Sequence, residues 1–356
     1  MQKGLSLSQL AAKIEANREL KRDLVVKTRD LRMEAQSDGV LALAVPGQGS
    51  FPVEELAHDQ IGTHLDIPAK YYDRMKKEEP KLLATNVNRW FEKRIETDKA
   101  GNPERRMVRT LAGNNRAFLS NRYQRIENEE VLAAGMQALS DQRDVQIVSA
   151  EATERRLYLQ FVIPSIQGEV KVGDVVQAGG ILSNSEVGLG AVSVAGLIWR
   201  LWCLNGAKTQ DAFRKNHVGR QAAEGELDWA DDTRAADDRA VLLKVRDMVK
   251  AVTDEARFKA QLAKLQELAA PKIEGDPAEA VEVLAQKVGA NDVERGGILR
   301  ALIEGGDLSA WGLINAVTAQ SHTTKSYDRA VELEAAGGRL IELPASEWKE
   351  VLTAGA

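Results

Sequence analysis

The sequence predicts an α+β fold, with a central antiparallel sheet, a helical N-terminal segment before it and a helical C-terminal region after it. Apolar residues recur at helical spacing over residues 6–20 and again over residues 235–269. Between these segments, residues 105–205 hold short apolar runs separated by the turn signals GNN, SAEATE, SIQGE and AGG. With 356 residues, 44% of them apolar, the chain is long enough for two domains or one large domain with helical additions.

The first hundred residues predict a leader helix, a β-hairpin and three short helices. Residues 6–20 have an apolar stripe, and Ser6 or Ser8 precedes it as a candidate cap. The runs LVVKTRDLRMEA and GVLALAVPG flank the turn signal SDG and predict a hairpin. Each of the three following helices is expected to start near a proline, at Pro52, Pro68 and Pro80.

The remaining chain predicts an antiparallel core followed by helices. One helix is expected near 127–140 among the strands, and a long helical stretch over 235–269. Asp276-Pro277 is a start signal for a helix that runs to Val288, and GDLSAWGLINAVTAQ starts another. The expected division is therefore an N-terminal hairpin with short helices (1–104), an antiparallel α+β core domain (105–222), an acidic linker (223–239) and a helical C-terminal region (240–356).

Composition excludes several classes of protein. The formal net charge of −5 provides no global attraction to nucleic acid or to an anionic membrane, so any nucleic-acid role requires a local basic patch. Cys203 is the only cysteine, which excludes an intramolecular disulfide framework and a thiolate zinc site. No apolar run is long enough for a membrane span, and charged residues interrupt the N-terminal segment where a signal peptide would need an apolar run. We expect a protein of the host-cell cytosol without metal or cofactor.

The stretch SNSEVGLG at 183–190 resembles a catalytic loop but matches no catalytic motif. It lacks the G-x-G-x-x-G fingerprint of dinucleotide-binding proteins, and the chain has no P-loop and no G-x-S-x-G elbow. Its glycines and hydroxyl or amide side chains instead predict a tight bend between strands. Arg200 is a candidate partner for Glu186. The residues expected to form this structural turn are Asn184, Ser185, Gly188 and Gly190.

Two segments of the middle region are locally basic. Residues 105–125 contain six arginines, no acid and an interleaved tyrosine, and residues 200–220 contain a second group of cations. Arginines beside an aromatic ring suit single-stranded nucleic acid, although charges that protect a strand edge give the same pattern. The acidic run at 223–239 offers another partner for this basic surface, within one chain or between copies. The candidate nucleic-acid contacts are Arg109, Arg116, Arg122, Tyr123, Arg125, Lys208, Arg214, Lys215 and Arg220.

A run of motifs resembles the phage and plasmid-like protein family defined by domain of unknown function 932. The motifs are LSNRY at 119–123, NSEVG at 184–188 and C-x-N-G at 203–206, with His217 shortly afterwards. The resemblance extends over about residues 55–343. It implies a protein of phages, prophages or plasmids that acts in DNA metabolism or host takeover, and it brings no catalytic residues with it.

Three functions from different classes remain. The leading hypothesis is a non-enzymatic homo-oligomer that binds nucleic acid, with single-stranded DNA favoured, in a role similar to phage single-strand annealing proteins. The alternative enzyme is a hydrolase or nuclease built on Glu186 and His217 with Asn184, which would have to converge in one cleft. The third is a scaffold that binds only protein, through the acidic run and the C-terminal helices.

Overall fold

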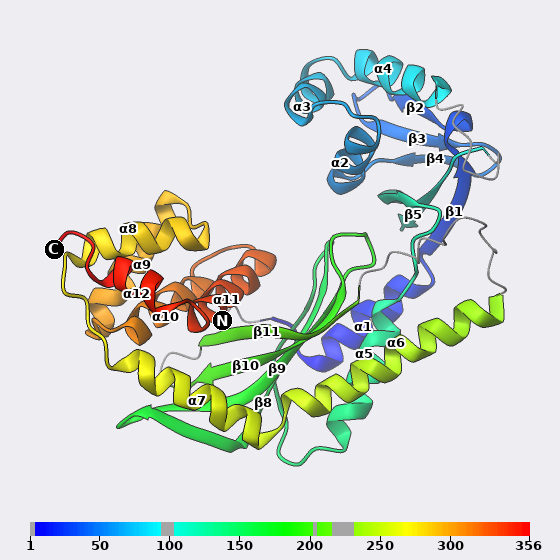
Figure 1. Ribbon diagram of the computed structural model, residues 1–356. Helices are drawn as coiled ribbons and strands as arrows, with labels where there is room; N and C mark the ends of the chain where they lie inside the picture. Colours follow the sequence, from blue (N-terminus) through cyan, green and yellow to red (C-terminus); the bar gives the residue numbers. More distant parts are fainter. Residues whose placement is uncertain (1–3, 94–102, 202–204, 216–230) are drawn as a thin grey trace, which may run out of the picture.

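The computed structural model describes residues 4–93, 103–201, 205–215 and 231–356. Antiparallel sheets occupy the first part of the chain and helices the C-terminal part, so the fold is α+β as the sequence predicts (Figure 1). None of the helices in these residues is long and apolar enough to cross a bilayer.

A five-stranded antiparallel sheet forms the centre of the molecule, with strand order β11-β10-β9-β8-β7. Because side chains alternate between the two faces of a strand, helices can cover both sides. Leu157, Leu159 and Phe161 pack with helices on one face, while Tyr158 of the same strand packs with Tyr327 on the other. The strands are β7 (Gln146–Ala152), β8 (Leu157–Lys171), β9 (Asp174–Asn184), β10 (Val192–Arg200) and β11 (Asn205–Lys215).

Three helices pack against the first face of this sheet (Figure 1). Val241, Val245 and Val249 form the apolar stripe of the longest one and lie in the same core cluster as β8 and β10. The first helix begins at a capping box in which Ser6 Oγ accepts from the Gln9 amide. These helices are α1 (Leu7–Arg18), α5 (Asn128–Ser140) and α6 (Asp231–Val252).

An N-terminal lobe projects from one end of the sheet (Figure 1). It contains two three-stranded antiparallel sheets, β1-β5-β6 and β2-β3-β4, with three helices around one apolar core. The strands are β1 (Lys21–Lys27), β2 (Arg32–Ala35), β3 (Leu41–Val45), β4 (Gly49–Pro52), β5 (Arg105–Leu111) and β6 (Asn114–Ser120). The helices are α2 (Glu55–His64), α3 (Ala69–Glu78) and α4 (Pro80–Lys93), and the short 3₁₀ helix η1 spans Thr28–Asp30.

The C-terminal helices gather at the other end of the sheet and share a core with β8 to β11 (Figure 1). Gly338 lets α11 lie directly on the edge strand, because a Cβ at this position would lie 1.6 Å from the carbonyl oxygen of Lys208. The elements are α7 (Glu255–Ala269), α8 (Pro277–Val288), α9 (Asp292–Gly305), α10 (Ala310–Ala319), η2 (Gln320–His322), α11 (Tyr327–Ile341) and α12 (Ala345–Leu352).

Most local elements match the sequence predictions, and four differ. The run LVVKTRDLRMEA is two strands in different sheets, because only β2 forms the predicted hairpin with β3, while β1 pairs with β5. The stretch over 235–269 is two helices, because the Asp254 side chain accepts from the Arg257 amide and caps a new helix. The segment predicted as an acidic linker already becomes helical at Asp231. The first two strands after residue 104, β5 and β6, pair with β1 and not with the five-stranded sheet.

Candidate nucleic-acid interface

The SNSEVGLG segment connects β9 to β10, so it forms the bend that its composition predicts. Asn184 Nδ2 donates to the Ile126 carbonyl at 3.0 Å, and Ser185 Oγ accepts from the Leu189 amide at 3.1 Å. Gly188 has a φ of +80°, which L side chains rarely adopt, and Gly190 lies against the guanidinium of Arg156. The bend is thus tied to the start of α5 and to its own backbone.

We predict that Gly188→Ala destabilises the protein by about 1–3 kcal/mol, because its Cβ would combine a strained backbone with a 2.6 Å contact to Leu119 Cδ2. Gly296→Ala is the control, since a Cβ at Gly296 in α9 meets nothing within 4 Å and alanine favours a helix. Urea unfolding of both variants checks the prediction. Equal stability of the two variants would contradict it.

Glu186 lies at the centre of a network of charged groups, which we call the ion network: Lys21, Asp23, Arg109, Arg116, Glu127, Glu129 and Glu186. The Glu186 carboxylate, 4% exposed, accepts from Arg116 Nη1 at 2.8 Å and from Lys21 Nζ at 2.7 Å. The Asn128 amide at the start of α5 donates to the same carboxylate at 2.7 Å. Its pairing therefore joins β1 and β6 of the N-terminal lobe to the end of β9 and to α5.

Arg109 forms the second half of the ion network. Its side chain is 1% exposed, and Nε donates to Asp23 at 2.8 Å while Nη2 donates to Glu127. Nη1 donates to the carbonyl oxygen of Glu186 at 2.7 Å. Asp23 and Arg109 face each other across β1 and β5, so strand register places this pair.

The ion network keeps Glu186 ionised. Burial alone would raise the pKa of Glu186, but Arg116 and Lys21 outweigh it and lower the pKa to about 2. The same contacts raise the pKa of Lys21 against the effect of burial. A carboxylate with so low a pKa, surrounded by donors, is a weak general base at neutral pH, which disfavours the hydrolase role for Glu186.

Glu127, Glu129 and Glu186 also have the spacing of a metal-binding group, with ligand oxygens within 4.8 Å of one another. Lys21 Nζ lies 3.0, 3.1 and 2.7 Å from these three carboxylates respectively. The ammonium thus supplies at this position the positive charge that a metal ion would bring.

Several of the sequence-predicted contacts are buried or half-buried in the structure. Arg109 and Arg116 are buried and paired with carboxylates, so their charges are already matched inside the protein. Tyr123 OH donates to the Ser185 carbonyl at 2.8 Å, and its half-buried ring packs beside Leu119, which leaves it unsuited as an open stacking platform. The paired acids Asp23, Glu127 and Glu186 all lie outside residues 105–125, which explains why that segment looks uniformly basic.

Arg200 does not pair with Glu186. Its Nε donates to Asp174 at 2.6 Å, and Asp174 also accepts from Trp311 Nε1 at 2.8 Å. Asp174 lies at the start of β9 and Glu186 just beyond its end, so strand direction separates the two carboxylates.

The remaining predicted contacts divide into three groups. Arg122 and Arg125 are exposed on the segment between β6 and α5. Lys208 is half-buried on β11, and Arg214 and Lys215 lie at the end of the same strand, paired in register with Ser193 and Val192. Arg220 lies outside the described part of the chain, as do the catalytic candidate His217 and most of the acidic run.

The described end of the acidic run lies beside the basic segment. Gln124 Nε2 donates to Asp238 at 2.6 Å and to Asp237 at 3.1 Å. The start of α6 therefore contacts the stretch that carries Arg122 and Arg125, within one chain.

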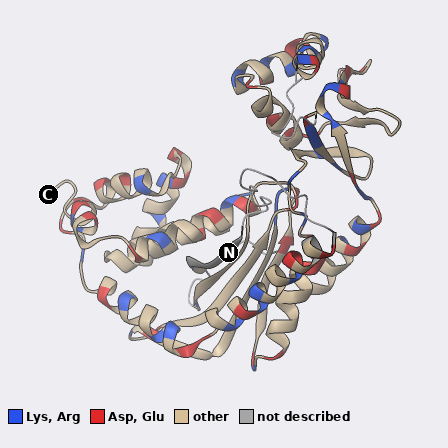
Figure 2. Cartoon of the chain, turned by 45° about the vertical axis from the view of Figure 1, so that its right-hand side comes forward, with Lys and Arg blue, Asp and Glu red and all other residues tan. Residues whose placement is uncertain are grey.

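Three exposed arginines surround the outer side of the ion network, and we call them the arginine rim: Arg18, Arg22 and Arg125. With Lys21, Asp23, Arg109, Glu127 and Glu129 they line a pocket of about 320 Å³. The lining carries five cations and three carboxylates, a net charge of +2. Among the described residues no ion-pair partner is found for Arg22. Figure 2 shows that most other charges lie on helices, while the five-stranded sheet carries few.

Sequence reasoning missed the part of this surface that α1 and β1 contribute. Arg18, Lys21 and Arg22 occur in the run ANRELKRD, a basic signal that is diluted by two acids. Their importance follows only from the pairing of β1 with β5, which brings them beside Arg109 and Arg125.

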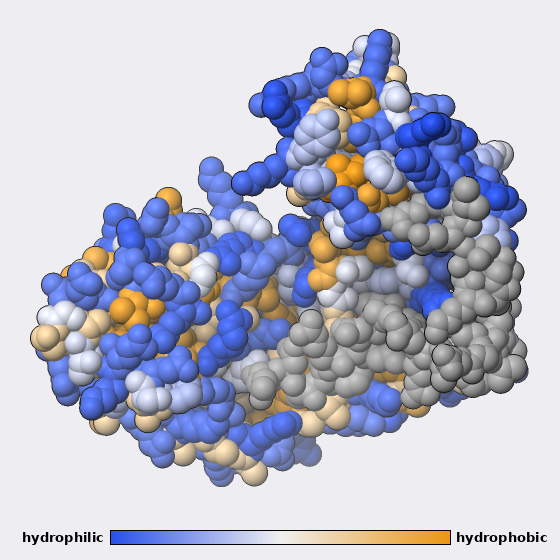
Figure 3. All heavy atoms as spheres, turned by 45° about the horizontal axis from the view of Figure 1, so that its top comes forward, coloured by the Kyte–Doolittle hydropathy of each residue, from blue (hydrophilic) through white to orange (hydrophobic). Residues whose placement is uncertain are grey.

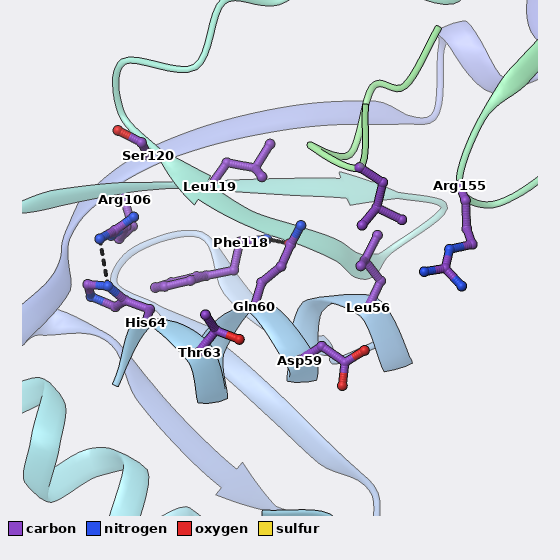
Figure 4. Close-up of a pocket in the computed structure, with 11 residues that line it drawn as sticks. Leu56, Asp59, Gln60, Thr63, His64, Arg106, Phe118, Leu119, Ser120 and Arg155 are labelled. Carbon is purple, nitrogen blue, oxygen red and sulfur yellow. Dashed lines mark hydrogen bonds between the residues drawn. The ribbon is translucent and has the colours of Figure 1, made fainter. Parts of the chain in front are cut away.

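A second cavity, which we call the apolar pocket, lies where the N-terminal lobe meets the five-stranded sheet. It has a volume of about 450 Å³ and is formed by α2, β5, β6 and two turns of the five-stranded sheet. Figure 4 shows Arg106 at one end and Arg155 at the other, with Leu56 and Leu119 between them. Figure 3 shows hydrophobic atoms where the N-terminal lobe meets the rest of the molecule.

Comparison with known families identifies the chain. Residues 117–334, more than half of the sequence, match the model described as domain of unknown function DUF932. The protein belongs to the DUF932 family. The matched DUF932 region begins in β6 and contains the LSNRY segment, the NSEVG bend and the whole five-stranded sheet. No curated protein and no solved structure matches the chain.

Proposed function

We propose that this DUF932 protein is a non-enzymatic nucleic-acid-binding protein that takes single-stranded DNA at the arginine rim. Its role would be in the DNA metabolism of a phage or plasmid, as a homo-oligomer similar to single-strand annealing proteins. The observation that carries the proposal is the distribution of charge around the ion network. The buried acids are already matched by Lys21, Arg109 and Arg116, whereas the rim arginines extend into solvent.

Guanidinium groups suit this role because their planar donors fit phosphate oxygens. The rim draws its arginines from three separate elements, α1, β1 and the segment before α5, so the fold holds them around one pocket. Arg122 lies three residues before Arg125 on an exposed segment and extends the basic surface toward the apolar pocket. Tyr123 is held by its hydrogen bond to the Ser185 carbonyl, so another part of the surface must provide the contact with the bases.

The test is fluorescence anisotropy of the protein with labelled single-stranded and duplex oligonucleotides, at low and moderate salt. We expect tighter binding to single strands, with a salt slope of roughly −2 if three phosphates are neutralised. An annealing assay with complementary strands and a measurement of oligomeric state follow from that result. No binding at low salt would reject the proposal and favour the protein-only scaffold.

A further inference from the structure

The apolar pocket has the size and lining of a site for a flat ring. Its volume of about 450 Å³ falls within the roughly 300–1,000 Å³ range of small-molecule sites. Leu56, Leu119 and Leu189 come from three different segments and form its apolar walls. Gln60 holds these segments together, because Nε2 donates to the Val187 carbonyl at 2.8 Å and Oε1 accepts from the Phe118 amide at 2.7 Å.

The charged groups at the ends of the pocket differ in how they are held. Arg106 Nη2 donates to His64 Nδ1 at 2.6 Å, and Arg106 also pairs with Glu104 at 3.0 Å. Arg155 is exposed, and no ion pair involves its guanidinium among the described residues. Figure 4 shows it on the side of Leu56 and Asp59. Arg155 is thus the cation at the pocket that is open to an anionic group.

A short segment links the apolar pocket to the arginine rim. Ser120 lines the apolar pocket, and Arg125 lines the rim pocket only five residues later. Five residues span at most about 18 Å, so a strand of a few nucleotides reaches from one site to the other. Exposed Arg122 lies on the segment between them.

We infer that the apolar pocket takes one unstacked base of the bound single strand, while the phosphates of that strand lie on Arg155, Arg122 and the arginine rim. This inference rests on the proposed function and adds the site at which a base binds. Stacking and apolar contact with a base face accept every base, so the site is expected to lack strong sequence preference. A duplex, whose bases are paired and stacked, cannot use the pocket without unpairing.

The test compares an oligothymidine strand with an abasic strand of equal length and equal phosphate number. The wild-type protein is expected to bind the thymidine strand about tenfold more tightly, since contact of a base with a protein surface contributes to affinity beyond the phosphates. Leu189→Trp fills the pocket and is expected to reduce that ratio to about one, with little effect on the abasic strand. Arg155→Ala should weaken the binding of both oligonucleotides.

Leu243→Trp is the matched control, because Leu243 is 42% exposed on α6, away from the pocket. The ratio of affinities for the thymidine and abasic strands should be the same in this variant as in the wild type. Circular dichroism verifies that each variant is folded. A wild-type ratio near one, or an unchanged ratio in Leu189→Trp, overturns the inference even when both strands bind in a salt-dependent way. Failure of both strands to bind overturns the proposed function as well.

Discussion

Replacing Glu186 by glutamine is expected to lower the free energy of unfolding at pH 7 by about 3–5 kcal/mol, because it leaves buried cations without their carboxylate. The Glu186 carboxylate accepts from three donors, Lys21 Nζ, Arg116 Nη1 and the Asn128 amide, and the carboxylates of Glu127 and Glu129 also lie within 4.8 Å of it. A glutamine amide has one acceptor oxygen, and its NH₂ group would face these donors. The change keeps the side-chain volume and so isolates the charge.

The effect of Glu186→Gln should depend on pH. The folded-state pKa of Glu186, about 2, is below its ordinary value of 4.5, so its contribution to stability is present above about pH 4.5 and is lost as pH falls toward 2. The difference in unfolding free energy between wild type and variant should therefore be largest at neutral pH and decrease below about pH 4.5. Urea unfolding at pH 7 and pH 3.5 measures both values.

Glu129→Gln is the control for this experiment. Glu129 pairs with Lys21 at 3.1 Å, but its side chain is 30% exposed, so its loss should cost no more than about 1 kcal/mol. If Glu186→Gln were as stable as Glu129→Gln, the ion network would not be what holds the N-terminal lobe to the five-stranded sheet.

The triple substitution of Arg18, Arg22 and Arg125 by alanine is expected to weaken single-strand binding on the order of a hundredfold, at roughly 1 kcal/mol for each lost phosphate contact. The salt slope should become less steep by roughly 2, because three fewer counterions are released. Anisotropy titrations at several salt concentrations measure both quantities. The three arginines are exposed, so the variant should stay folded.

A control triple variant removes the same charge elsewhere: Lys244→Ala, Lys259→Ala and Lys349→Ala. These lysines are exposed on α6, α7 and α12. If the control weakened binding as much as the rim variant, net charge and not the arginine rim would explain the interaction. An unchanged affinity in the rim variant would remove this surface from the proposed function.

Local structure was largely predictable from the sequence because its causes are local. Ser6 caps α1, and Asp276 caps α8 by accepting from the Ala278 amide two residues away. Gly188 has the positive φ that a tight bend requires. Such hydrogen bonds and backbone preferences involve residues that are neighbours in the chain, so a short stretch of sequence contains both interacting residues.

The candidate site was only partly predictable, because its contacts join residues that are far apart in the sequence. The sequence pointed to the LSNRY and NSEVG segments, which do lie together, since Tyr123 donates to the Ser185 carbonyl. It also suggested that Arg109 and Arg116 face nucleic acid, because no acid is near them in the sequence. Arg109 pairs with Asp23, 86 residues away, and with Glu127, 18 residues away, and Arg116 pairs with Glu186, 70 residues away.

The sequence by itself thus determined the α+β class, the capped starts of α1 and α8, and the bend that carries Glu186. Only the tertiary structure decided which cations are buried and which are exposed. Pairing of β1 with β5 sets Asp23 opposite Arg109, and docking of the lobe on β9 places Lys21 and Arg116 on Glu186. A charge is neutralised by whatever lies within a few ångströms in space, and that distance is independent of separation along the chain.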